Sequence, residues 1–407
     1  MSRTIVAFYL LLLSCAIGLS IYFSRLIGNI GVLAAYGIFL TISFVEVTNR
    51  QSRSLSEINI PSCHHPAIFI PAVVLWVVFT IGYILDPSFR AFQRLGAFTI
   101  LSAISIFVVP AVISREQAFR AIGIFSAACT IVGFPTVFLG DYTILGLKFG
   151  QSAGVHLITS NIGYSVPAAF FDSVKYYRVL VAIGTICSGG LYFRTRDSWM
   201  GIAFVLNLFM VVLTVGRASI LAVIVAGFLT IVYRFGNTRA LAGVTLIGGC
   251  IVAVVVGISF GILPGPTELG KSLLGKRVGF WSASYQAFAA RPIIGWGLAD
   301  TAAIVSEFYP LGTLTGTHNS YLRLFVIGGS VGGVAYLLLC ASALLLAFQA
   351  VRDHVPFGLT TFCLVVAALI FQLFDGATIF GTAISSILWA FVIGYAQPTV
   401  SSGDTVG

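Results

Sequence analysis

The chain has 407 residues, of which 58% are hydrophobic and only 9% are charged, and its formal net charge is +9. Soluble domains carry about 25% charged residues, so this chain lacks the polar groups needed to cover a water-soluble core. The composition therefore excludes an ordinary soluble enzyme and predicts an all-α polytopic membrane protein. Residues 1–407 are expected to form a single membrane domain.

Apolar runs long enough to cross a bilayer core of about 30 Å recur along the chain. The first, Ile5 to Phe23, is long and no Ala-x-Ala site follows it, so we expect a retained span and not a signal peptide. Nine runs have spanning length and three are shorter but bounded by arginines; the twelve lie at about 5–23, 27–45, 67–85, 95–113, 121–140, 179–193, 199–215, 219–233, 240–263, 321–349, 357–374 and 377–396. We predict about twelve transmembrane helices, with both chain ends on one side.

Arginines in the short connections predict which side is cytoplasmic, because cytoplasmic loops are enriched in Lys and Arg. If the N-terminus is cytoplasmic, the cytoplasmic segments hold ten arginines: Arg3, Arg50, Arg53, Arg115, Arg120, Arg194, Arg196, Arg234, Arg239 and Arg352. The short outer connections then hold only four: Arg25, Arg90, Arg94 and Arg217. This ratio predicts cytoplasmic N- and C-termini.

Two connections on the outer side are long, at about 141–178 and 264–320, and both are basic. The enrichment of Lys and Arg in cytoplasmic segments applies mainly to short loops. Positive charge in a long outer loop is therefore either tolerated without a role or required for a function. The functional alternative is a cationic cavity that faces outward and binds an anion.

The second long loop contains the densest group of candidate site residues. Arg277 and Trp281 are four residues apart and share a face if this stretch is helical. A guanidinium suits a phosphate and an indole suits a sugar ring; the alternative is an amphipathic helix lying at the lipid headgroups. Further substrate-binding candidates in or next to this loop are Lys276, Arg291, Asn319 and Arg323.

His318 lies where the second loop re-enters the membrane, just before a long apolar run. An imidazole titrates near pH 6.5 and is a natural general base at neutral pH; the alternative is a capping or interfacial residue. Arg217 lies in a tight outer turn between two predicted spans. A charge near lipid is costly unless it is paired or in a wet cavity, although Arg217 could also extend to the headgroups.

Several motifs of other enzyme classes do not occur. The outward-facing acids form no Asp-x-Asp or Asp-x-Glu pair of the kind that holds a divalent metal, and the chain has no P-loop. Six of the seven cysteines lie inside apolar runs, where cysteine behaves as a small hydrophobic residue. We expect no metal, no cofactor and no nucleic-acid partner, and we expect arginines to replace a metal.

Four elements together resemble the O-antigen ligase and O-antigen polymerase superfamily of bacterial envelope glycan assembly. In chain order they are Gly216-Arg217-Ala218-Ser219, Arg277 with Trp281 and Pro292-Ile293-Ile294-Gly295-Trp296-Gly297, His318-Asn319-Ser320-Tyr321-Leu322, and the glycine-rich segment Gly328 to Gly333. The resemblance covers residues 214–335. In the last element, small residues at four-residue spacing predict close helix packing.

The resemblance implies a fold, a reaction and a location. It implies the metal-independent GT-C fold, and transfer of a glycan from undecaprenyl diphosphate to a sugar hydroxyl of the lipid A core. The site would face the periplasm from the bacterial inner membrane, with membrane lipid around the chain. His318 matches the family's general base, and Arg277 and Arg217 match the arginines that hold the diphosphate.

Two other functions remain open. A polymerase would use the same site to join lipid-linked repeat units; we favour the ligase because neither Arg277 nor Arg291 is followed by the glycine, eleven positions on, of some polymerases. A transporter or flippase of a lipid-linked anion would also use arginines. The absence of repeated, broken helices in the sequence disfavours it.

Overall fold

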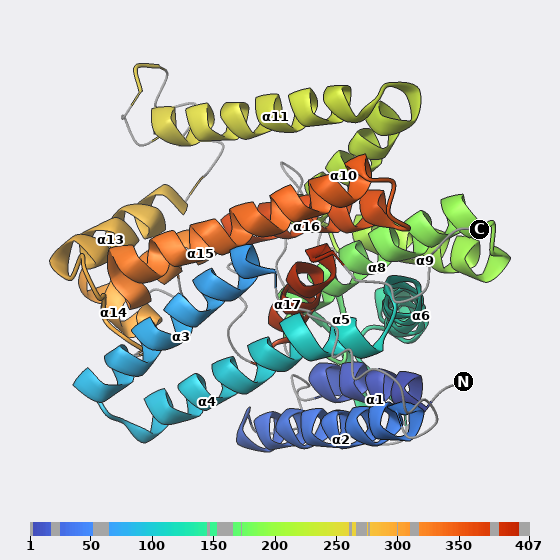
Figure 1. The fold of residues 1–407 in the computed structure, drawn as a ribbon, viewed down its shortest axis with the longest axis horizontal. Helices are drawn as coiled ribbons and strands as arrows, with labels where there is room; N and C mark the ends of the chain where they lie inside the picture. The colour runs from blue at the N-terminus through green and yellow to red at the C-terminus, as the bar shows by residue number, and fades with distance from the viewer. Residues whose placement is uncertain are drawn as a thin grey trace.

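The computed structural model describes residues 3–17, 25–51, 65–144, 147–152, 166–171, 173–259, 263–265, 275, 277–298, 300–309, 317–374 and 382–398. It is an assembly of α-helices (Figure 1). The helices in the twelve predicted segments are α1 (Arg3–Ile17), α2 (Arg25–Gln51), α3 (Pro66–Leu85), α4 (Phe89–Ala103), α6 (Arg115–Gly133), α8 (Val174–Thr195), α9 (Ser198–Leu213), α10 (Arg217–Phe235), α11 (Thr238–Ser259), α15 (Ser320–Arg352), α16 (Gly358–Phe374) and α17 (Ile384–Ala396). The short elements η1 (Ile104–Val108) and α5 (Val109–Val112) follow α4, and α7 (Thr136–Leu139) follows α6.

Among the described residues, seven helical segments are long and apolar enough to cross a membrane. They are Gly28–Glu46, Pro66–Leu85, Phe89–Val112, Arg115–Leu139, Arg217–Phe235, Thr238–Ser259 and Ser320–Arg352. Four more helices are apolar but shorter, namely α1, α9, α16 and α17. The integral membrane class is therefore supported, whereas the number of twelve crossings stays a prediction.

Polar residues begin several helices in the way that helix capping requires. Ser88, Ser114, Ser173, Asp197 and Asn319 each accept a hydrogen bond from a backbone N–H in the first turn of the helix that follows. Such caps satisfy amide groups that have no partner within the helix. They fix where α4, α6, α8, α9 and α15 start.

The two long connections contain regular structure. The first holds a three-stranded antiparallel sheet of β1 (Tyr142–Ile144), β2 (Leu147–Ser152) and β3 (Val166–Ala169), in the order β1-β2-β3. The predicted all-α class is supported for the chain as a whole, and these three short strands are an addition to it. Helix α8 begins at Val174, before residue 178, where the first connection was expected to end. The second contains α13 (Arg277–Ala290) and α14 (Thr301–Glu307). Strands this short cannot be predicted from the positions of long apolar runs.

The longest helix, α15, lies beside α3 and α16, and α11 lies at the edge of the assembly in Figure 1. Where α15 meets α3, a Cβ on Gly328 or Gly332 would lie 3.5 or 3.4 Å from the Val78 side chain. This confirms close packing for these two glycines. The buried apolar core runs through most of the helices, including α8, α15, α16 and α17.

One end of the helix assembly gathers several basic residues. Arg120 of α6 pairs with Asp197, between α8 and α9, and Arg115 donates to the carbonyls of Tyr395 and Gln397 at the end of α17. The start of α6, the turn between α8 and α9 and the end of α17 therefore lie together. All were predicted to be cytoplasmic, and this grouping is consistent with that orientation, which remains a prediction.

Candidate functional site

The segment Pro292–Leu298, between α13 and α14, binds along the first half of α15 through its backbone. The amides of Trp296 and Gly297 donate to the carbonyls of Val326 and Ile327, each at 2.9 Å. In the other direction, the Ser330 amide and hydroxyl both donate to the Pro292 carbonyl at 2.7 Å. These contacts tie the second long connection to α15 near its start.

Two glycines make this docking possible. Gly329 has φ +59° and ψ −159°, which breaks α15 locally, and Gly295 has φ +75°. A Cβ on Gly329 would lie 2.2 Å from the Ile293 carbonyl oxygen, and one on Gly295 would lie 2.4 Å from the Gly329 nitrogen. The expectation of helix packing for the whole glycine segment was therefore incomplete: Gly329 interrupts the helix so that another backbone can approach it.

The predicted helix around Arg277 is α13, and it brings three candidate residues near one another. The guanidinium carbon of Arg277 lies 5.3 Å from the centre of the Phe374 ring, at the end of α16. One turn later, the Phe280 ring stacks on the His318 imidazole, with ring centres 5.5 Å apart and planes at 25°. Trp281 is 1% exposed. Its burial argues against an indole at the lipid headgroups.

His318 occupies a constrained position between the second connection and α15. Its φ of +48° is in the left-handed region, which His, Asn and Asp tolerate better than most residues. The side chain that caps α15 belongs to Asn319, whose Oδ1 accepts from the Leu322 amide at 3.0 Å. The cap of α15 is therefore supplied by Asn319, and the His318 imidazole lies against Phe280.

Arg217 is the first residue of α10, and its side chain is exposed. The turn before it is held by Arg178 of α8, whose Nε donates to the Thr214 carbonyl at 2.8 Å. The Ser219 hydroxyl in turn donates to the Arg178 carbonyl at 3.2 Å. The sequence analysis did not single out Arg178, because its contact with Thr214 joins residues that are 36 positions apart in the chain.

Helix geometry places Arg217 at the same level as the end of α16. Tyr233 near the end of α10 contacts His354 just before α16, and the Cys363 thiol contacts the Ala226 carbonyl at 3.5 Å, so the two helices are antiparallel. At a rise of 1.5 Å per residue, α10 starts about 14 Å from Ala226. The end of α16 lies about 17 Å from Cys363, in the same direction. Arg217 therefore lies near the level of Phe374, which Arg277 covers.

The other candidates lie apart from this group or outside the description. Arg291 is about 20 Å along α13 from Arg277 by helical rise, and its guanidinium carbon lies 4.1 Å from the centre of the Trp296 ring. The Arg323 Nε is buried and has no hydrogen-bond partner in the described part of the chain. Arg94, missed as a candidate, donates to the Leu298 carbonyl at 2.7 Å. Lys276 lies outside the described residues.

The charges at this end are mainly cationic. Asp300 faces Arg90 at 3.6 Å, and both side chains are largely exposed. Within the described ranges, no group of three or more His, Cys, Asp or Glu side chains is placed to hold a metal ion. An imidazole that stacks on Phe280, one helical turn from the guanidinium of Arg277, suits an anionic ligand that also carries a sugar.

The fold and these residues define the class of a helical membrane protein with a basic, aromatic candidate site at one end of its helices. Residues 202–337 match the family model described as O-antigen ligase. The match starts within α9, ends within α15 and contains Arg217, Arg277 and His318. The match covers about a third of the chain, and it supports the resemblance to the O-antigen ligase and polymerase superfamily that the motifs predicted. A comparison with curated proteins finds no significant match.

Proposed function

We propose that this chain is an O-antigen ligase-type glycosyltransferase that moves a glycan from undecaprenyl diphosphate to a lipid A-core hydroxyl at the periplasmic face of the inner membrane. The match of residues 202–337 to the O-antigen ligase family model supports an enzyme of ligase or polymerase type. The observation that carries the finer proposal is the stacking of His318 on Phe280, one helical turn from Arg277. In this proposal the protein has a GT-C-like architecture and needs no metal or cofactor.

The proposed reaction assigns one task to each residue. The neutral His318 imidazole accepts the proton of the acceptor hydroxyl while the hydroxyl oxygen bonds to the anomeric carbon of the glycan. The bond from that carbon to the diphosphate oxygen breaks, and the diphosphate leaves with the electron pair. Arg277 and Arg217 stabilise the growing negative charge through bidentate hydrogen bonds.

The positive φ of His318 decides which variant tests this proposal. His318→Asn removes the base but keeps a residue type that tolerates the left-handed region, whereas His318→Ala adds backbone strain. We expect His318→Asn to lower the transfer rate by roughly 10²–10⁴-fold while the protein remains inserted and as heat-stable as the wild type. Transfer is measured with purified protein, lipid-linked glycan and core acceptor. Full transfer by His318→Asn would remove His318 from the role of base.

A polymerase remains the alternative within the same superfamily. Arg178 is followed by glycine eleven positions on, at Gly189, the spacing found in loops of some polymerases. Both residues lie inside α8, however, so here the spacing belongs to a helix. Surface glycans of a deletion strain separate the two functions. Loss of a ligase leaves the core without any repeat unit, whereas loss of a polymerase leaves single repeat units attached.

A further inference from the structure

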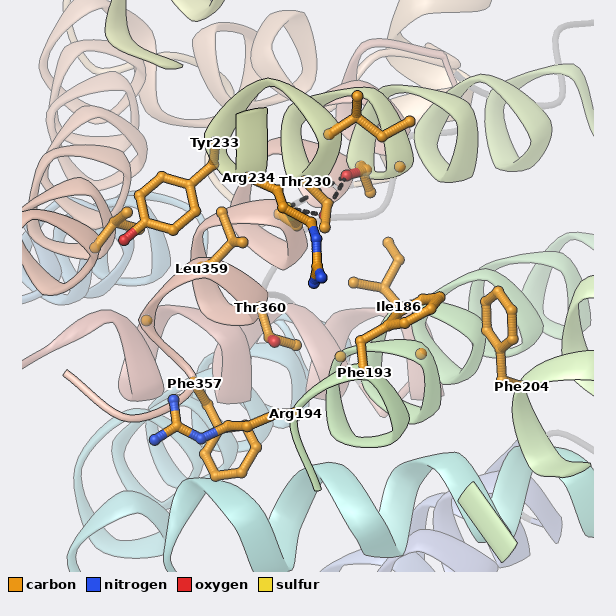
Figure 2. Close-up of a pocket in the computed structure, with 18 of the residues that line it drawn as sticks. Ile186, Phe193, Arg194, Phe204, Thr230, Tyr233, Arg234, Phe357, Leu359 and Thr360 are labelled. Atoms are coloured by element: carbon orange, nitrogen blue, oxygen red, sulfur yellow. Dashed lines mark hydrogen bonds between the residues drawn. The ribbon is translucent and has the colours of Figure 1, made fainter. Parts of the chain in front are cut away.

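Figure 2 shows a cavity of about 950 Å³. Its lining residues in α10 and around the end of α15 place it at the end of the helix assembly opposite to His318. It is formed by the last turns of α8 and α10, the turn between α15 and α16, and part of α9. Arg217 and His318 lie at the starts of α10 and α15, which are long helices, so the cavity is separate from the candidate glycosyltransferase site. Its size is that of a cavity for a small-molecule ligand, about 300–1,000 Å³.

The walls of this cavity are mostly apolar. Ile186, Phe193, Phe204 and Leu359 surround the space in Figure 2. On the α10 side, Gly227 lines the cavity, and a Cβ at this position would meet no atom within 4 Å. The interior therefore has room and chemistry suited to a hydrocarbon chain.

The mouth of the cavity is cationic. Arg194, Arg196 and Arg234 line it and are exposed, and none of them forms an ion pair with any acidic side chain that the structure describes. Arg194 lies over the Phe357 ring with its guanidinium carbon 4.9 Å from the ring centre, and Arg234 extends between α10 and Thr360 (Figure 2).

The acids close to the mouth have other partners. Asp197 pairs with Arg120, and Asp353 pairs with Arg352 at 3.0 Å. Three guanidiniums thus remain available at the entrance to an apolar space. Guanidinium groups bind phosphate through paired hydrogen bonds, and basic pockets between transmembrane helices bind anionic lipid headgroups.

We propose that this cavity binds an anionic phospholipid of the surrounding bilayer, with an acyl chain between the apolar walls and the headgroup phosphate on Arg194, Arg196 and Arg234. A neutral lipid would leave this concentration of positive charge without a match. A soluble anion would make no use of the apolar interior. The predicted orientation places the cavity in the cytoplasmic leaflet, and the inference does not depend on the proposed glycan transfer.

Native mass spectrometry of the purified full chain in detergent tests this proposal. Phosphatidylglycerol and phosphatidylcholine with identical acyl chains are titrated separately, and retained lipid is counted. We expect one phosphatidylglycerol to be retained at a concentration at least tenfold lower than phosphatidylcholine. In the R194Q/R234Q variant this preference disappears, whereas R3Q/R239Q keeps it, because Arg3 and Arg239 are exposed arginines outside the cavity that are also predicted to be cytoplasmic.

A second variant tests the apolar part of the site. Gly227→Leu places a side chain in the open space and should abolish retention of the lipid while the protein stays monodisperse. Gly243→Leu is the matched control, because Gly243 is also helical and also faces open space, on α11. Equal retention of both lipids by the wild type, displacement by inorganic phosphate alone, or normal retention by Gly227→Leu would each overturn the proposal.

Discussion

The two ends of this helix assembly carry positive charge in different surroundings. At the motif end, defined by Arg217, Arg277 and His318, charged residues lie beside aromatic rings and a backbone docked into a broken helix. At the cavity end, defined by Arg194, Arg196 and Arg234, the charged residues surround an apolar space between helices. The comparison teaches that charge alone does not identify a reactive site.

The difference lies in what surrounds the charged groups, because both ends contain a histidine: His318 at the motif end and His354 in the cavity lining. At the motif end the Pro292–Leu298 backbone docks into the helix break at Gly329, and His318 stacks on Phe280 one helical turn from Arg277, an arrangement that suits chemistry at fixed distances. The cavity end has exposed arginines on helix ends, which suit a mobile amphipathic ligand. The following variants test this contrast, from the largest expected effect to the smallest.

Gly329→Ala should disrupt the motif end most strongly. The new methyl group would overlap the Ile293 carbonyl, and alanine at φ +59° is strained, so we expect a destabilisation of about 4 kcal/mol. Thermal unfolding in detergent measures it. Gly243→Ala, on α11 at a site with open space, should be neutral or slightly stabilising. Equal stability of the two variants would contradict a required helix break at Gly329.

Arg277→Lys should lower glycan transfer by about a hundredfold. A lysine ammonium keeps the charge but cannot form the paired hydrogen bonds of a guanidinium with a diphosphate. Steady-state transfer with purified protein measures the loss. Arg239→Lys, at the start of α11 and outside both sites, is the matched control and should keep the wild-type rate. Comparable rates for both variants would show that Arg277 acts, at most, as a point charge.

Asn319→Ala should cost about 1 kcal/mol of stability through loss of the cap of α15. The Asn319 Oδ1 accepts the Leu322 amide, and serine can accept the same hydrogen bond. Asn319→Ser should therefore restore most of the thermal stability. If both variants lose transfer to the same extent while Asn319→Ser remains stable, Asn319 contacts substrate in addition to capping the helix.

Asp197→Asn should have the smallest effect, less than about 1 kcal/mol, because the pair with Arg120 is partly exposed. The Arg120 hydrogen bond holds the pKa of Asp197 below its ordinary value. The ionised form is thus favoured in the folded protein, and its stabilisation is complete above the unfolded pKa near 4 and is lost as the pH falls through the folded pKa. Thermal unfolding at pH 7 and at low pH should show the difference between wild type and variant only at pH 7.

Part of the fold and of the candidate site could be predicted because both depend on local sequence. Long apolar runs predict helices wherever lipid is the solvent, and the four-residue spacing of Arg277 and Trp281 places them on one face of α13. The three-stranded sheet and the role of Arg178 could not be predicted in this way. Both depend on contacts between segments far apart in the chain, such as the Arg178 hydrogen bond to Thr214.

The sequence by itself determined the membrane class, the helical segments and the superfamily motif, because composition, periodicity and residue order express them directly. Only the tertiary structure decided that Gly329 breaks α15 to receive the Pro292–Leu298 segment, that His318 lies on Phe280, and that three arginines surround an apolar cavity. These features arise from close packing between distant segments, and the positions of such contacts are set by the whole fold.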